Sequence, residues 1–140
     1  MNTYNIDDEN FINSSIYQNF IKENPSRGNL RIRAFAASQA IPISGLNIVV
    51  SKVIDNNNVV FFEGKTDESG LIEKISLPAP KIVTDNLDVP DKTTYEIQAT
   101  YVPDNVVSIF KVNMYENICV VQNINIVPDT TLEMGVVNGR

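Results

Sequence analysis

Paired carboxylates are the candidates for acid–base chemistry in this sequence, whose 140 residues include no histidine. The Ser/His/Asp and Cys/His pairs that activate a nucleophile are therefore excluded. The candidate groups are Asp67 with Glu68, and Asp85 with Asp88 and Asp91. A carboxylate-based hydrolase is the remote enzymatic alternative that these residues leave open.

Both groups of carboxylates also have a simpler interpretation. Residues 66–70, Thr-Asp-Glu-Ser-Gly, separate two apolar runs, and this pattern predicts a tight turn in which Asp67 bonds its own backbone. Residues 85–91 offer oxygen ligands for Ca²⁺ but lack the Asp-x-Asp-x-Asp-Gly spacing. No Gly-x-Gly-x-x-Gly or Walker-type loop occurs. We therefore expect no catalytic residue, no metal and no cofactor.

The chain is acidic, since 11 Lys and Arg against 17 Asp and Glu give a formal charge of -6. This balance opposes binding to nucleic acid or to an anionic membrane, because both need clustered cations. The one dense basic group is Arg27, Arg31 and Arg33, which we interpret as the solvated face of a strand. The single cysteine, Cys119, allows no intrachain disulfide and is expected to be a buried thiol.

Residues 7–24 have the periodicity of one amphipathic helix. Its apolar stripe includes Phe11, Ile16, Tyr17 and Phe20, which are our candidate interaction residues. A helix of this length is marginal in water, so the stripe must pack on something. Two alternatives stay open: the stripe packs on the chain's own sheets, or it docks on another chain.

After Gly28 the hydrophobic period changes to two, as in half-buried strands. Seven segments are predicted to be strands: 30–36, 46–50, 59–63, 72–77, 95–101, 106–112 and 118–127. Polar residues 55–58 predict a hairpin between the second and third of them, and residues 81–93 predict a long loop. We therefore predict a mainly β fold, a seven- or eight-stranded antiparallel β-sandwich with one N-terminal amphipathic helix. The expected divisions are a helical segment over 1–27, the sandwich over 28–128 and a tail or linker over 129–140.

Two turn motifs occur in a fixed order among these strands: Pro42-Ile43-Ser44-Gly45, then Thr66-Asp67-Glu68-Ser69-Gly70. This order resembles the start of a carboxypeptidase-regulatory-like or transthyretin-like β-sandwich. Further matching segments are 16–25, 28–35, 39–43, 77–80, 94–97 and 123–128. Together they are similar to the N-terminal accessory domain of clostridial spore cortex-lytic enzymes and related peptidoglycan-associated proteins. The resemblance implies a transthyretin-like topology, with an immunoglobulin-like Greek key as second choice, and it carries over no catalytic residue.

The leading expectation is a non-catalytic interaction module of spore or cell-envelope biology, with a protein or peptidoglycan as its partner. A carbohydrate- or peptidoglycan-binding domain is the alternative, but Tyr95 and Tyr101 fall on the predicted inward face and would not form an exposed sugar platform. No window is apolar enough to span a bilayer, and the N-terminus lacks the pattern of a signal peptide. The expected localisation is the spore or cell envelope, from the resemblance, after cytoplasmic synthesis without Sec export.

Overall fold

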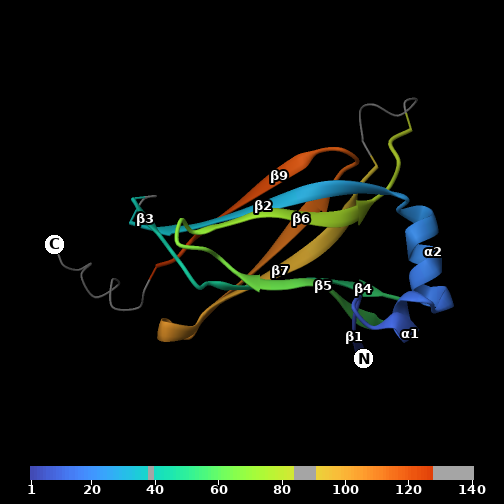
Figure 1. Ribbon diagram of the computed structural model, residues 1–140, viewed down its shortest axis with the longest axis horizontal. Coiled ribbons are helices and arrows are strands. Elements are labelled where there is room, and N and C mark those ends of the chain that lie inside the picture. The colour runs from blue at the N-terminus through green and yellow to red at the C-terminus, as the bar shows by residue number, and fades with distance from the viewer. Residues whose placement is uncertain (38–39, 84–90, 128–140) are drawn as a thin grey trace.

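The computed structural model describes residues 1–37, 40–83 and 91–127, and within them it places nine strands in two sheets. The five-stranded sheet has the order β1-β5-β4-β7-β8. In the four-stranded sheet β2 is central, with β6 and β3 along one edge and β9 along the other. The two sheets lie as two layers (Figure 1). The strands are β1 (Thr3–Asn5), β2 (Ser26–Ala36), β3 (Ile41–Pro42), β4 (Asn47–Ile54), β5 (Asn57–Lys65), β6 (Leu71–Ala79), β7 (Thr93–Tyr101), β8 (Val106–Met114) and β9 (Cys119–Asn125).

Each sheet turns one apolar face toward a shared core. Leu30 and Ile32 of β2 are fully buried, and so are Ile48 of β4 and Ile97 of β7. These residues belong to one buried cluster that draws on both sheets. The alternation seen in the sequence therefore marks the inward positions, and the predicted mainly β fold is confirmed.

All seven predicted strands are present, and the short strands β1 and β3 are additional to the prediction. The predicted purely antiparallel arrangement is wrong, because β1 pairs parallel to β5 and β9 pairs parallel to β2. The chain crosses from the five-stranded to the four-stranded sheet between β8 and β9, so β9 is not a hairpin partner of β8. The predicted hairpin between β4 and β5 is confirmed. Asp55 and Asn56 have φ angles of 47° and 66°, as a type I′ turn requires.

The N-terminal segment forms two helices, α1 (Glu9–Ile12) and α2 (Ser15–Glu23), where one was predicted. Ser14 divides them: its backbone is extended, and its Oγ accepts a hydrogen bond from the Tyr17 N–H at 3.4 Å. Serine competes in this way with helical backbone bonds, so it favours a cap over a helix interior. The second helix ends at Glu23, and Asn24 is its C-cap, so the predicted stop before Pro25 is confirmed.

The N-terminal segment also supplies β1, which lies in the five-stranded sheet beside β5. Strand β2 begins at Ser26, close to the expected start of the sandwich. The predicted tail over 129–140 and residues 84–90 of the predicted loop lie outside the described residues.

The predicted turn at 66–70 is confirmed, and it carries the chain from β5 in one sheet to β6 in the other. Asp67 Oδ1 accepts hydrogen bonds from the N–H groups of Ser69 at 2.8 Å and Leu71 at 3.0 Å. Gly70 has a φ of 75°, and a Cβ built on it would collide with the carbonyl oxygen of Ala34 in β2. The turn therefore needs glycine for both its backbone conformation and its close approach to β2.

Replacing Gly70 with alanine is expected to lower the unfolding free energy by about 2 kcal/mol or more, since left-handed strain and a steric clash combine. Gly45 is the matched control, because its φ is 76° and nothing lies within 4 Å of a Cβ built there. Gly45→Ala should lower the unfolding free energy by about 1 kcal/mol, through left-handed backbone strain alone. Urea unfolding of both variants tests this, and equal losses at the two positions would contradict the close approach at Gly70.

Tyr95 should make stability depend on alkaline pH. Its ring is buried, and its hydroxyl donates a hydrogen bond to the Pro78 carbonyl oxygen at 2.6 Å. Burial raises the pKa of Tyr95 far above its usual value. The unfolded chain therefore loses this proton first, so the stabilisation is complete below about pH 10 and falls as the pH rises further.

The variant Tyr95→Phe is expected to flatten this alkaline loss, because it removes the titrating group. Near neutral pH it should be less stable by about 1 kcal/mol, through the lost hydrogen bond. Urea unfolding between about pH 7 and pH 11 measures both effects. The same alkaline slope in the variant and the original chain would rule out Tyr95 as the source.

Candidate functional site

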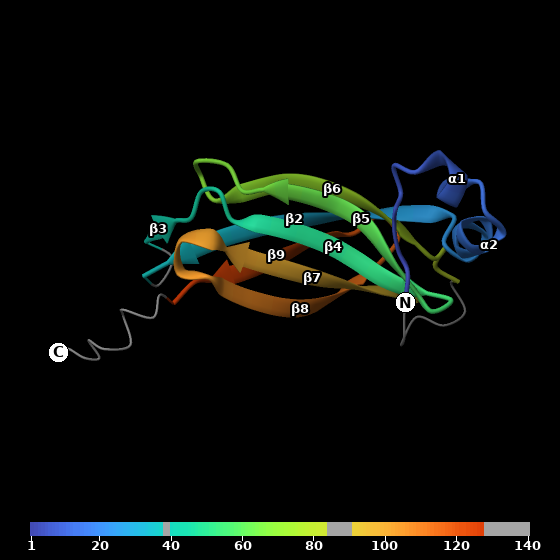
Figure 2. The same ribbon diagram turned by 90° about the horizontal axis from the view of Figure 1, so that it is seen from below.

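The four candidate interaction residues lie at one end of the molecule, where α1 and α2 cover the ends of the sheets (Figures 1 and 2). Phe11 and Phe20 are buried, with 4% and 6% of their surface exposed. Ile16 and Tyr17 are half-buried and pack against the same core. Of the two alternatives, the structure thus shows the stripe packed on the chain's own sheets.

Aromatic rings connect these helices to the centre of the core. The rings of Tyr17 and Phe20 lie 6.4 and 5.7 Å from the ring of Phe61 in β5, measured between centroids. Phe61 in turn meets Tyr95 of β7 edge-on at 5.1 Å. Rings attract each other at such separations. The stripe is therefore part of the folded unit, and Phe20 is not free to contact a partner.

Three arginines share the outer face of β2, and we name Arg27, Arg31 and Arg33 the arginine row. Side chains alternate along a strand, so the burial of Leu30 and Ile32 directs the arginines away from the core. Because β2 has hydrogen-bonded neighbours along both edges, the row occupies the middle of the sheet and not its rim. The prediction of an outward strand face is confirmed for these residues.

Neighbouring strands hold two of the guanidinium groups in place. Arg27 Nε donates to Ser76 Oγ at 2.7 Å, and Arg27 Nη2 donates to the Ser76 carbonyl oxygen at 3.0 Å. Arg33 Nη1 donates to Asn123 Oδ1 at 3.4 Å, and its guanidinium carbon lies 5.9 Å from the ring centroid of Phe35. Ser76 belongs to β6 and Asn123 to β9. Sequence reasoning did not find these two residues, because only the pairing of β6 and β9 with β2 brings them to the row.

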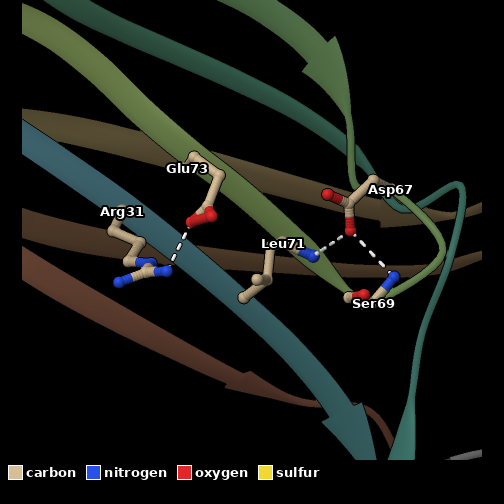
Figure 3. A network of polar contacts seen from close by, with 5 residues as sticks. All are labelled: Arg31, Asp67, Ser69, Leu71 and Glu73. Atoms are coloured by element: carbon tan, nitrogen blue, oxygen red, sulfur yellow. Dashed lines mark hydrogen bonds and ion pairs between the residues drawn. The ribbon is translucent and has the colours of Figure 1, made fainter.

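Arg31 forms an ion pair with Glu73 of β6 (Figure 3). The two side chains are 40% and 61% exposed, so solvent screens their attraction. The Nε of Arg31 is buried and has no hydrogen-bond partner among the described residues. The ion pair with Glu73 therefore leaves part of the hydrogen-bonding capacity of Arg31 unused. The three arginines also outnumber the one paired carboxylate, so the row is locally cationic on a chain whose formal charge is -6.

The arginine row has the chemistry of an anion-binding surface. An arginine fork can bind a carboxylate or a phosphate through two parallel hydrogen bonds. Arg31 and Arg33 are separated by roughly 7 Å along the strand, and Arg27 is roughly 13 Å from Arg31. Donors at such intervals on an open sheet face suit the repeated anionic groups of an extended polymer better than one enclosed small molecule.

The predicted carboxylate pair has a structural role at Asp67, whose carboxylate bonds the backbone N–H groups of Ser69 and Leu71 (Figure 3). Asp85 and Asp88 of the second group lie outside the described residues. In the part of the chain that the structure describes, no three His, Cys, Asp or Glu side chains are grouped so that they could hold a metal ion.

The prediction of a buried thiol at Cys119 is wrong, because this cysteine is exposed. Ile124 is the buried residue of β9 and fixes the phase of the strand. Cys119 is five residues away and therefore lies on the outer face, in register with Asn29 of β2. An apolar run on an edge strand does not require every member to be buried.

A search against models of protein families finds no match for this chain, and a search of characterised proteins finds no relative. Over residues 1–37, 40–83 and 91–127, no helix has the length and apolar character needed to cross a membrane.

Replacing Phe20 with alanine is expected to lower the unfolding free energy by about 3–5 kcal/mol, because it leaves a cavity between α2 and Phe61. Val53→Ala is the control, since Val53 is 55% exposed and should change stability by less than about 0.5 kcal/mol. Urea unfolding compares the two. If Phe20→Ala were as stable as the original chain, the stripe would not be part of the core.

Proposed function

We propose that this chain is a non-catalytic interaction module that binds an anionic polymer of the cell envelope, peptidoglycan first, through the arginine row. The observation that carries the proposal is the set of three guanidinium groups directed outward from one central strand of an acidic chain. We also propose a transthyretin-like sandwich as the fold type, with an immunoglobulin-like Greek key second. The shared core of the two sheets supports a sandwich of either type.

The net charge of the chain does not prevent such binding. At physiological ionic strength the Debye length is about 8 Å, so acidic groups on distant surfaces are largely screened at the row. The guanidinium groups that touch the polymer then dominate the local interaction. This reasoning predicts a short-range attraction that weakens as salt is added.

Peptidoglycan is a suitable partner for the row, because its stem peptides carry carboxylates that repeat along the polymer. A hydrogen bond to a charged group contributes about 1.5–3 kcal/mol. Several such contacts along one polymer reinforce each other, since the first raises the effective concentration of the next. The hydroxyl of Ser76 and the amide of Asn123 flank the row and offer neutral hydrogen-bonding groups beside the charges.

The spore or cell-envelope setting of the proposal comes from the resemblance of residues 15–128 to the accessory domain of cortex-lytic enzymes. The structural role of Asp67 supports a non-catalytic module. A sugar platform built on aromatic rings has less support, since Tyr95 is 1% exposed and Tyr101 is packed against the core. The arginine row is therefore the surface on which the proposal rests.

The double variant Arg27→Gln/Arg33→Gln is expected to bind purified peptidoglycan at least about tenfold more weakly, because the loss of one charge-assisted hydrogen bond is worth about 1.5 kcal/mol. Arg31 is left in place so that Glu73 keeps its partner. Co-sedimentation at low and high salt measures the binding. The control Lys22→Gln/Lys65→Gln changes the net charge equally at two exposed positions outside the row, and it should bind like the original chain.

Equal losses in the two double variants would show that net charge, and not the row, controls binding. Failure of the original chain to sediment with peptidoglycan would refute the proposed partner. The proposal would also be refuted if the chain bound a nucleic acid of similar charge density as tightly as it binds peptidoglycan. Such a result would show that the surface recognises negative charge alone.

A further inference from the structure

A second group of charged residues surrounds an open depression on the five-stranded sheet. Lys52 of β4, Thr94 and Glu96 of β7 and Lys111 of β8 line it, and its volume is about 260 Å³. Glu96 lies directly opposite Lys111 on one side and Ser51 on the other, so three strands meet at this level of the sheet. We name this feature the charged depression.

Lys52 is held in a defined position in the charged depression. Its Nζ donates a hydrogen bond to the Thr94 carbonyl oxygen at 2.9 Å and lies 5.9 Å from the ring centroid of Tyr95. Burial lowers the pKa of Lys52, and the neighbouring ammonium group of Lys111 lowers it further. The two ammonium groups thus act on each other, and an anion placed between them would relieve their repulsion.

Glu96 supplies a negative charge to the same depression. Glu96 is in register with Lys111 on the neighbouring strand. Among the described residues, however, Glu96 forms no ion pair with Lys111 or Lys52, since the ion pair found there joins Arg31 and Glu73. Two ammonium groups and one carboxylate therefore line the depression without contact between opposite charges at ion-pair distance. A ligand with its own carboxylate and its own ammonium group is complementary to this arrangement.

We propose that the charged depression binds a small zwitterion, with the ligand carboxylate between Lys52 and Lys111 and the ligand ammonium group at Glu96. A free α-amino acid and a short peptide share this chemistry, and a depression of about 260 Å³ is large enough for either. It is slightly smaller than the pockets of roughly 300–1,000 Å³ that hold drug-sized ligands. The charged depression lies on the five-stranded sheet and the arginine row on the four-stranded sheet. Zwitterion binding can therefore be tested independently of peptidoglycan binding.

The probes are alanine and alanylalanine, titrated into the ¹⁵N-labelled full chain and followed by amide chemical shifts. Both probes carry a carboxylate and an ammonium group. The probe with the lower dissociation constant indicates whether the site prefers an amino acid or a dipeptide. Saturable shifts are expected at Thr94, Glu96 and Lys111, with a dissociation constant on the order of 1 mM. Acetate and ethylamine each carry one of the two charges and should bind at least roughly fivefold more weakly.

The variants Lys111→Gln and Glu96→Gln should each weaken alanine binding at least roughly fivefold. The control Lys65→Gln should leave it unchanged, because Lys65 is exposed and pairs with Asn47 at the other end of β4 from Lys52. Lys111 is exposed, so its replacement tests the site even if Lys52→Gln disturbs the fold. Acetate binding as tight as alanine binding would overturn the role of Glu96, and with it the proposal. Absence of saturable shifts, or shifts that neither variant changes, would also overturn it.

Discussion

The burial of one face of β2 is the constraint on which most of this structure depends. The strand has hydrogen-bonded neighbours along both edges, so its backbone groups are satisfied within the sheet and each side chain can point only inward or outward. Leu30 and Ile32 are fully buried between the sheets. A guanidinium in the same position would lose its hydration at a cost of several kcal/mol. This cost determines which face of β2 is turned inward. The core and the arginine row both follow from that orientation.

The central position of β2 also explains how an acidic chain presents a cationic surface. Arg27 and Arg33 each receive a polar neighbour from a different strand, Ser76 from β6 and Asn123 from β9. Side chains that are already held in place lose less conformational entropy when they bind a ligand. The sheet therefore concentrates and orders these cations, although nothing about the net charge of the chain predicts such a surface.

The connections between the sheets depend on a small number of polar contacts. Thr66 is buried beside the crossing from β5 to β6, and its hydroxyl donates to the Ile43 carbonyl oxygen at 2.7 Å while accepting from the Leu46 N–H at 3.0 Å. Gly70 then brings the chain against β2. At the far end of the molecule, Phe20 and Phe61 connect the helices to the core, which short helices need because they are marginal in isolation.

The sequence by itself determined the seven long strands, the turn at 66–70 and the outward direction of the arginines, because alternation and turn chemistry are local properties of the chain. It did not determine which strands pair, and so it missed both parallel pairs and the approach of Ser76 and Asn123 to the arginine row. Nor did it determine which face of β9 is buried, and so it missed the exposure of Cys119. It also predicted one helix where the cap at Ser14 makes two. Only the tertiary structure decided these features, because pairing depends on which apolar faces meet across large separations in sequence. The meeting of Lys52, Glu96 and Lys111 at one depression has the same origin, since three strands had to align before their charges could act together.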